Sequence, residues 1–323
     1  MKTKTIDAVL RKKMKAWWKS IEDPKVRNLA ERDTIVTGGA IASMLLREPV
    51  NDYDVYFSNY KTTVAVAKYY VEVFAKQRKA NSGIEVDIRT EEEIDSYGEK
   101  RIKIVVSSSG IASDDDSQSQ YGYFELNDAP SEAQAYVHEV MDGGTDPEAQ
   151  GQIEQTFIKA EEKALADEDE AFRPVFLSTN AITLSQKVQL VLRFYGDAEK
   201  IHSNYDFIHC TNYWTPDQGV VLNKAALEAL LTKELRYVGS KYPLASVIRM
   251  RKFIQRQWTI NAGQILKMLY QLNQLDLTDI QILEEQLTGV DVAYFQEVLV
   301  ALKKADTKKI DGAYLLEIID RMF

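Results

Sequence analysis

Residues Thr34–Asn59 read TIVTGGAIASMLLREPVNDYDVYFSN, and they indicate how the first half of the chain folds. Thr34–Thr37 is rich in β-branched residues and runs directly into Gly38-Gly39. Helix-forming residues follow, and Tyr53–Phe57 is again β-rich. The pattern therefore predicts a strand, a glycine turn, a helix and a second strand.

Two carboxylates stand at the start of the second predicted strand. Asp52 and Asp54 are two residues apart, so on a strand their side chains project from the same face. Neighbouring like charges disfavour double ionisation, and a divalent cation between them removes that difficulty. Mg²⁺ favours carboxylates together with substrate phosphates, and a pair of such ions can hold both oxygens of an in-line displacement. The pair predicts a site for two Mg²⁺ ions, or for Mn²⁺ in their place.

The glycine turn before the predicted helix suits a phosphate group. Gly38 and Gly39 have no Cβ to obstruct a triphosphate. The helix N-terminus that follows offers free N–H groups and a favourable dipole. Ser43, about one turn into the helix, could add a hydroxyl. We expect this turn to bind the nucleotide.

The Gly-Gly turn with Asp52 and Asp54, at this spacing, resembles the nucleotidyltransferase superfamily of DNA polymerase beta, poly(A) polymerases and CCA-adding enzymes. The whole chain also resembles phage-type nucleotidyltransferases. The resemblance implies a polymerase beta-like head and a magnesium-dependent enzyme that moves a nucleoside monophosphate from an NTP, such as ATP, to an acceptor hydroxyl. It implies a third carboxylate on a later strand. The metal ligands and nucleotide-binding residues that it implies in this stretch are Asp52, Asp54, Gly38, Gly39 and Ser43.

Two residues are candidates for the third carboxylate. Asp206, in NYDFIHC, follows the β-rich run VQLVLRF and a turn at Gly196, so we expect it on a strand antiparallel to that run. Asp87, in GIEVDIR, comes sooner after the pair and shares a strand face with Glu85. We prefer Asp206 as the catalytic residue and metal ligand, because the acidic surroundings of Asp87 are typical of a solvated segment.

A second resemblance lies downstream, to class II poly(A) polymerases and CCA-adding enzymes. The run Arg249-Met250-Arg251-Lys252-Phe253 is similar to their Arg-Ala-x-Arg-Phe motif. The run LSTNAI around Asn180 is similar to their Thr-x-Asn-Ala segment, but the Arg-Arg-Asp expected before it is absent. The resemblance implies that Asn180, Arg249 and Lys252 contact the nucleotide, and it does not extend to the selection of C and A.

The whole sequence predicts an α+β fold. Residues 1–30 form an N-terminal helical segment, in which Ile6–Ile21 is an amphipathic helix whose basic face is more commonly solvated than a binding surface. Residues 31–220 form the nucleotidyltransferase head with a mixed sheet, and an acidic insertion lies at about 85–172. The insertion includes a Ser-, Asp- and Gly-rich loop from Ser107 to about Asp128. Residues 221–323 have helical periodicity and form an all-α body.

The charge is unevenly distributed. The chain carries 49 Asp and Glu against 40 Lys and Arg, a net charge of −9. Glu85–Glu170 holds 24 of the acidic residues and six of the basic ones, so the remainder is mildly basic and RNA is not excluded. The lone Cys210 has no disulfide partner in the chain. No apolar run is long enough to span a membrane, so we expect a cytoplasmic protein, in the host cytoplasm if it is viral.

These observations favour nucleotidyl transfer to an RNA 3′ end, with tRNA as one candidate acceptor. Little covalent chemistry is asked of the protein in such a reaction, because positioning and charge stabilisation supply the rate. Two alternatives stay open. A nucleotidyltransferase that modifies a protein or a small molecule could use the same head, and a noncatalytic nucleotide- or RNA-binding protein could keep the fold. The sequence leaves the oligomeric state open.

Overall fold

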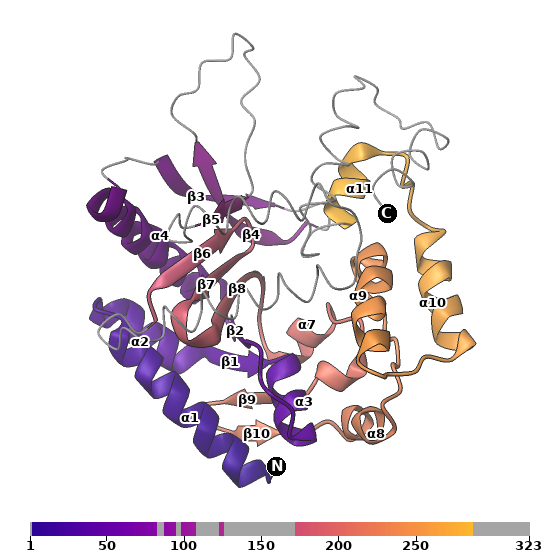
Figure 1. Ribbon diagram of the computed structural model, residues 1–323. Coiled ribbons are helices and arrows are strands. Elements are labelled where there is room, and N and C mark those ends of the chain that lie inside the picture. Colours follow the sequence, from indigo (N-terminus) through magenta and orange to yellow (C-terminus); the bar gives the residue numbers. More distant parts are fainter. Residues whose placement is uncertain (1, 83–86, 95–97, 108–122, 126–171, 287–323) are drawn as a thin grey trace. The chain divides into compact units, whose positions relative to one another are not determined.

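The computed structural model describes residues 2–82, 87–94, 98–107, 123–125 and 172–286 (Figure 1). These residues form two compact units. The first contains the described residues up to His202 together with Cys210–Asn223. The second contains Ser203–His209 and the described residues from Lys224 onward. Asp52 and Asp54 therefore belong to the first unit, and Asp206 and Arg249 belong to the second.

A mixed sheet of eight described strands forms the centre of the first unit. The strands are β1 Thr34–Thr37, β2 Tyr53–Phe57, β5 Tyr123–Glu125, β6 Pro174–Ser178, β7 Ala181–Leu184, β8 Val188–Tyr195, β9 Tyr213–Thr215 and β10 Gly219–Val221. Their spatial order is β10-β9-β1-β2-β8-β7-β6-β5. β2 and β8 run parallel, and the other pairs of this sheet are antiparallel. The neighbouring strands β1 and β2 are the two that the Gly-Gly turn and the helix after it connect.

One face of this sheet is apolar. Five side chains that follow one another across neighbouring strands are fully buried: Trp214, Val36, Val55, Leu190 and Ile182. Because successive side chains of a strand alternate between the two faces, the next row points to the opposite side. That row is polar.

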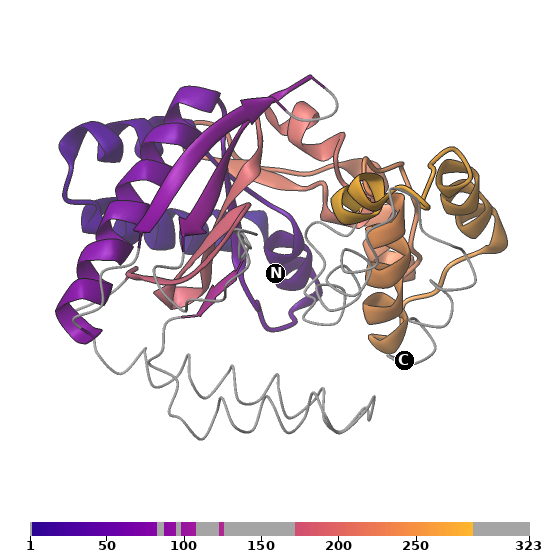
Figure 2. The same cartoon turned by 90° about the horizontal axis from the view of Figure 1, so that it is seen from above.

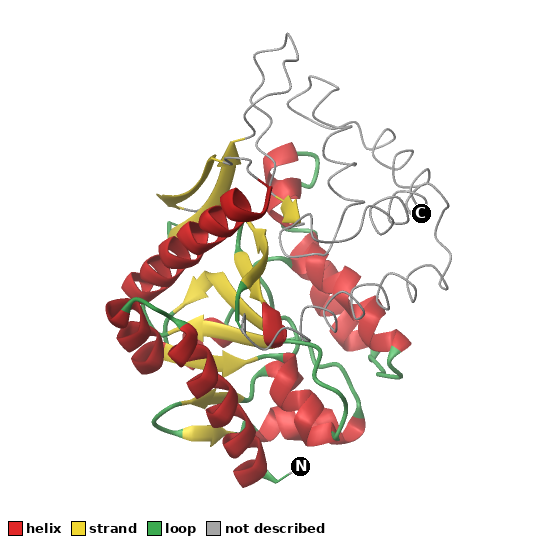
Figure 3. Cartoon of the chain, turned by 60° about the vertical axis from the view of Figure 1, so that its left-hand side comes forward, coloured by secondary structure: helices red, strands yellow, loops and turns green. Residues whose placement is uncertain are grey.

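Three helices cover the apolar face (Figures 1 and 3): α1 Thr3–Ser20, α2 Pro24–Asp33 and α4 Tyr60–Ser82. Trp17 of α1 packs 6.4 Å from Phe57 between ring centroids. Its Nε1 donates a hydrogen bond of 2.8 Å to the hydroxyl of Tyr70 in α4. Trp18 stacks on Trp214, with 6.4 Å between centroids. The aromatic residues of α1 thus fix this helix to both the sheet and α4.

A buried carboxylate joins α2 to α4. Asp33, 6% exposed, accepts hydrogen bonds from Arg32 Nε at 2.9 Å and from Asn59 Nδ2 at 2.7 Å. The hydroxyl of Thr62 donates a further short bond to it. Burial alone would raise the pKa of Asp33, but these hydrogen bonds outweigh it and lower the pKa to about 2. Asp33 is therefore held as a carboxylate.

A separate two-stranded sheet lies along α4 (Figure 2). It consists of β3 Asp87–Ile94 and β4 Lys100–Ser107, which pair antiparallel. The Tyr60 hydroxyl, at the start of α4, donates a hydrogen bond of 2.9 Å to Glu92 Oε2, and Lys68 Nζ lies 3.4 Å from Glu92 Oε1. Glu92 thus ties the hairpin to the helix.

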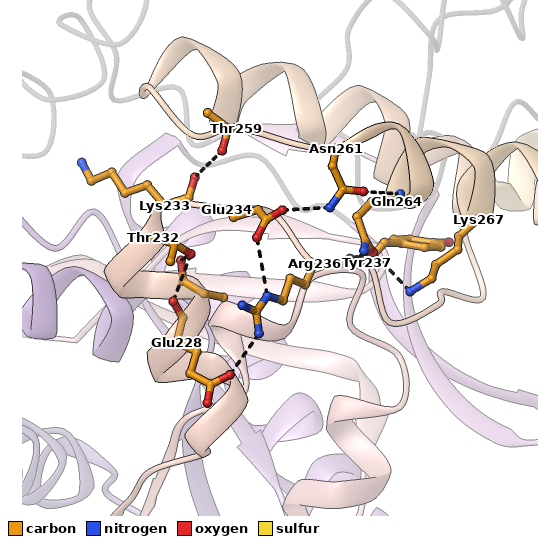
Figure 4. Close-up of polar contacts among 11 residues, drawn as sticks. Glu228, Thr232, Lys233, Glu234, Arg236, Tyr237, Thr259, Asn261, Gln264 and Lys267 are labelled. Carbon is orange, nitrogen blue, oxygen red and sulfur yellow. Dashed lines mark hydrogen bonds and ion pairs between the residues drawn. The ribbon is translucent and has the colours of Figure 1, made fainter.

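The second unit is helical in its described residues. Its helices are α8 Lys224–Thr232, α9 Pro243–Gln255, α10 Ala262–Leu272 and α11 Ile280–Gln286. A polar network joins the end of α8 to the start of α10 (Figure 4). Arg236 bridges Glu228, at 3.2 Å, and Glu234, at 3.8 Å, and Glu234 accepts a bond of 2.8 Å from Asn261. Asn261 also caps α10 by accepting from the backbone N–H of Gln264.

The chain combines helices with a mixed sheet, as the sequence predicts. β1 and β2 have the predicted bounds, and the β-rich run VQLVLRF lies in β8. Two predictions are wrong. NYDFIHC is not a strand, because Asp206 lies in a bend before the 3₁₀ turn Ile208–Cys210. The predicted loop from Ser107 to Asp128 contains β5, which pairs with β6. The acidic insertion and the end of the helical body fall mainly outside the described residues.

Candidate functional site

Asp54 stands at the centre of the polar row of the sheet. It pairs with Thr37 of β1 on one side and with Gln189 of the parallel strand β8 on the other. Thr183 of β7 follows Gln189, and Tyr213 of β9 follows Thr37. Asp54, Gln189 and Thr183 are partly exposed, whereas Thr37 is fully buried. Asp54 is therefore a carboxylate set among neutral polar side chains on a partly open face.

Gly38 brings the backbone against this carboxylate. It follows Thr37 directly and precedes α3, Gly39–Leu46, with φ 90° and ψ −149°. A Cβ at position 38 would lie 2.6 Å from Oδ2 of Asp54. Only glycine adopts this conformation without strain, and only glycine leaves room for the carboxylate. The first turn of α3 consequently starts beside Asp54.

Gly39 and Ser43 lie further along the same helix. A Cβ at Gly39 would meet nothing within 4 Å, so this position is open. Ser43 is half-buried within α3. The turn thus has one crowded glycine facing Asp54 and one uncrowded glycine at the helix start. This is the arrangement in which free N–H groups of a first helical turn can meet an anion.

Asp52 and Asp54 influence each other electrostatically. Asp52 is exposed and precedes β2, and Asp54 is the second residue of the strand. Burial raises the pKa of Asp54 well above its usual value, and the charge of Asp52 raises it further. Two carboxylates in this relation favour a bound cation, because a cation stabilises the doubly ionised state. The donor set of two carboxylates therefore fits the predicted magnesium.

Thr37 is anchored from a distant part of the chain. Its hydroxyl oxygen lies 2.8 Å from Nε2 of His202 and 2.9 Å from the carbonyl oxygen of Asn212. Burial lowers the pKa of His202 to about 4, so the ring is neutral at pH 7. The hydroxyl has one hydrogen, which it donates to Asn212, so the Nε2–H of His202 donates to the hydroxyl. The N–H of Gly38 donates to the carbonyl of Cys210 at 3.2 Å. These bonds fix the turn next to Asp54.

Asn180 lies in the same unit, in the turn between β6 and β7. Its backbone carbonyl accepts a hydrogen bond of 2.8 Å from the N–H of Leu192. Its side-chain Oδ1 is buried and has no hydrogen-bond partner among the described residues. Its contact with a nucleotide stays a prediction.

Asp206 forms an ion pair within the second unit. Its carboxylate accepts a hydrogen bond of 2.6 Å from Nε of Arg249, and their side chains are 15% and 31% exposed. Lys252 is exposed on the same helix, α9. Arg249 and Asp206 thus form a partly buried ion pair, which accounts for both residues structurally. Their roles toward a nucleotide or metal stay predictions.

The alternative third carboxylate, Asp87, begins β3. That strand belongs to the two-stranded sheet and is not hydrogen-bonded to β2. Across the described ranges, no three Asp, Glu, His or Cys side chains come together to hold a metal ion. In the described part of the first unit, the carboxylates that meet at the site are Asp52 and Asp54.

Comparison with known proteins identifies the family. Residues 8–233, more than half of the chain, match the Gabija anti-defense 2 family. The chain belongs to this family. The match begins within α1 and ends just after α8, so it includes the Gly-Gly turn, Asp52 and Asp54. No curated protein matches the sequence.

Among solved structures, a Thermotoga maritima CCA-adding enzyme in complex with tRNA is 11% identical, with a TM-score of 0.34, over 96% of this chain and 53% of that one. A tRNA-processing enzyme in an apo form is 12% identical, with a TM-score of 0.32, over 87% and 57%. The same kind of enzyme with CTP gives 12% and 0.32, over 89% and 54%. The chain thus spans little more than half the length of these proteins. TM-scores this low do not establish a shared fold.

Three residues of the candidate site are not among the site residues predicted from the sequence: Thr37 and Gln189, which pair with Asp54, and His202, which contacts Thr37. Gln189 is the first polar residue inside the apolar run VQLVLRF, which is a signal that could have been noticed. Thr37 ends the first strand and carries the same signal. His202 gives none, because it is 165 positions from Thr37 in the sequence.

No helix in the described ranges is both long enough and apolar enough to cross a bilayer. The longest, α4, has 23 residues and carries charges along its length.

Proposed function

We propose that this member of the Gabija anti-defense 2 family is a magnesium-dependent nucleotidyltransferase. The observation that supports the proposal is the contact between Gly38 and Asp54: the first turn of α3 starts against a carboxylate that has a second one, Asp52, beside it. A cation at Asp52 and Asp54 would be next to free helical N–H groups. Both groups suit a triphosphate.

The proposed reaction is an in-line displacement at the α-phosphorus. A bond forms between an acceptor hydroxyl oxygen and this phosphorus, the bond to the bridging oxygen breaks, and pyrophosphate leaves. The acceptor hydroxyl gives up its proton to bulk water. Bound magnesium would neutralise charge on the phosphate oxygens. The chain's own part is to hold the triphosphate at Gly38, Gly39 and Ser43 and to fix Asp54 through the anchored Thr37.

The acceptor that we propose is a hydroxyl at an RNA 3′ end. The basic remainder of the chain outside Glu85–Glu170 supports this choice, because phosphate backbones require cationic surface. The family name places its members against the Gabija defence. We therefore propose that the transfer serves that purpose.

A labelling experiment tests the reaction. The protein is incubated with Mg²⁺, each α-labelled ribonucleoside triphosphate in turn, total RNA and total protein. We expect label on RNA with the wild-type chain and none with Asp54→Asn. Asp217→Asn, an exposed carboxylate in the turn between β9 and β10, is the matched control and should keep the activity. Label on protein would redirect the proposal to modification of a polypeptide.

Binding is measured separately from turnover. The magnesium-dependent rise in melting temperature with each triphosphate should be present in the wild type and in Asp217→Asn, and absent in Asp54→Asn. An unchanged rise in Asp54→Asn would place the triphosphate elsewhere.

A second candidate function, nucleotide binding without turnover, is favoured by Gln189, which puts a neutral amide beside Asp54. A thermal shift without labelling of any acceptor would support that candidate.

A further inference from the structure

The outer face of α1 is a row of lysines. Lys4, Lys12, Lys15 and Lys19 are all exposed. At about 100° per residue they fall within roughly 80° of the helix circumference, and they extend along about 22 Å of its length. The opposite side carries the fully buried Ile6, Leu10, Met14 and Trp17. Because those side chains are fixed in the core, the lysine row is held toward solvent.

The carboxylate of α1 is turned away from this row. Asp7 accepts hydrogen bonds from Nε1 of Trp214 at 2.8 Å and from Arg11 at 3.2 Å. The Asp7 carboxylate thus connects α1 to β9 and does not lie among the lysines. No exposed residue of α1 is acidic.

None of the four lysines forms an ion pair with a carboxylate among the residues that the structure describes. Lys12 and Lys15 are three residues apart, and Lys15 and Lys19 are four apart. Like charges at these spacings destabilise a helix. The row therefore concentrates like charge on one helix face of a chain whose net charge is −9. An anionic partner would remove the repulsion.

The composition of this face selects the kind of anion. A lipid surface needs a set of exposed apolar side chains, but Val9, 37% exposed, is the one large apolar side chain that α1 exposes, and the others are buried against the sheet. A protein partner is usually held by aromatic or apolar anchors, and single-stranded nucleic acid by stacked aromatic rings. Trp17 and Trp18, the aromatic residues of α1, are 0% and 4% exposed. Lysines alone provide point charges, which match the phosphates of a duplex backbone.

We propose that the lysine row of α1 binds the phosphate backbone of double-stranded nucleic acid without reading its sequence. This surface lies over the apolar face of the sheet, whereas Asp54 belongs to the polar row. The proposal therefore does not depend on nucleotidyl transfer. It gives the protein a second contact with nucleic acid, independent of the candidate site.

The test is a binding titration with a fluorescent duplex of about 20 base pairs, measured by anisotropy from about 50 to about 200 mM salt. The variant is Lys12→Ala, Lys15→Ala, Lys19→Ala. The matched control is Lys61→Ala, Lys76→Ala, Lys224→Ala, which removes three exposed lysines from other helices and changes the net charge equally. Alanine favours helix, so α1 should keep its structure, which circular dichroism would verify.

We expect the α1 variant to reduce the slope of log affinity against log salt by about 2.7, or about 0.9 per lost phosphate contact. Across that fourfold salt range the three contacts account for about a 40-fold change in affinity. The control variant should keep the wild-type slope. Equal slopes for both variants would overturn the proposal. Tighter binding of a single-stranded RNA or of poly-glutamate than of the duplex, lost with the same three lysines, would also overturn it.

Discussion

Replacing Gly38 by alanine is the sharpest test of the geometry at Asp54. The backbone at Gly38 has φ 90° and ψ −149°, a region that residues with a Cβ rarely adopt. Holding alanine there costs about 1–3 kcal/mol. The added Cβ would also lie 2.6 Å from Oδ2 of Asp54, so the carboxylate must move. Together we expect the variant to lose about 2–4 kcal/mol of stability in the first unit.

Gly39→Ala is the neighbouring control. Nothing lies within 4 Å of its added Cβ, and the position opens α3. Alanine there should be neutral or should stabilise by up to about 1 kcal/mol. Two adjacent glycines should therefore differ by about 3 kcal/mol.

The assay is urea denaturation followed by tryptophan fluorescence. Trp17, Trp18 and Trp214 are buried in the first unit, and Trp258 is in the second. A Trp258→Phe background therefore reports the first unit alone. Equal midpoints for Gly38→Ala and Gly39→Ala would refute the placement of Gly38 against Asp54.

A double-mutant cycle separates the two causes. In an Asp54→Ala background the contact with the carboxylate is gone, but the backbone strain remains. Gly38→Ala should then cost about 1 kcal/mol less than in the wild type. An unchanged cost would mean that backbone conformation alone explains the requirement for glycine.

Three further predictions concern the neighbours of the site and the core. Gln189→Glu should tighten Mn²⁺ binding about tenfold, because it adds a negative charge about 5–6 Å from a cation at Asp54. Thr183→Glu, one strand further, should give a smaller gain in Mn²⁺ affinity; calorimetry measures both affinities, and equal gains would contradict the strand register. Thr37→Val should lower the free energy of unfolding by about 1–3 kcal/mol, because it removes the hydroxyl that bonds to the Asn212 carbonyl and to His202; unchanged urea midpoints would contradict this. The pKa of Asp33 in the folded protein, about 2, lies below its ordinary value of 3.8, so its contribution of about 2 kcal/mol to stability is complete above about pH 4 and is lost as the pH falls toward 2. Asp33→Asn should flatten this part of the profile of unfolding free energy against pH, and an equally steep profile would refute the prediction.

Local sequence was sufficient to predict the framework of the site. Thr34–Thr37 and Tyr53–Phe57 are strands because β-branched and aromatic residues are bounded by a glycine turn and by Pro49. The side-chain period of a strand then places Val55 and Asp54 on opposite faces. These inferences needed no information from other parts of the chain.

The same reasoning failed at Asp206, where tertiary packing overrides strand propensity. Phe207 is 3% exposed and packs between Tyr237 and Phe253 of the second unit, with centroid distances of 6.0 and 5.6 Å. It forms a single bridge with Tyr237 rather than a strand. Asp206 beside it pairs with Arg249. The aromatic residue beside this carboxylate is therefore a core residue outside any strand, and strand propensity alone could not distinguish a strand residue from such a core residue.

The chemistry of Asp54 depends on pairings that no local pattern contains. Its strand neighbour Gln189 is 135 positions away in the sequence. His202 and Asn212, which anchor Thr37, are more than 160 positions from Thr37. A carboxylate between a threonine and a glutamine is desolvated without being neutralised by a cationic side chain at those positions. Burial and Asp52 then both raise the pKa of Asp54. A lysine or arginine at position 189 would have provided an internal partner. A neutral amide at this position supplies no positive charge to Asp54, which suits the magnesium that we propose at Asp52 and Asp54.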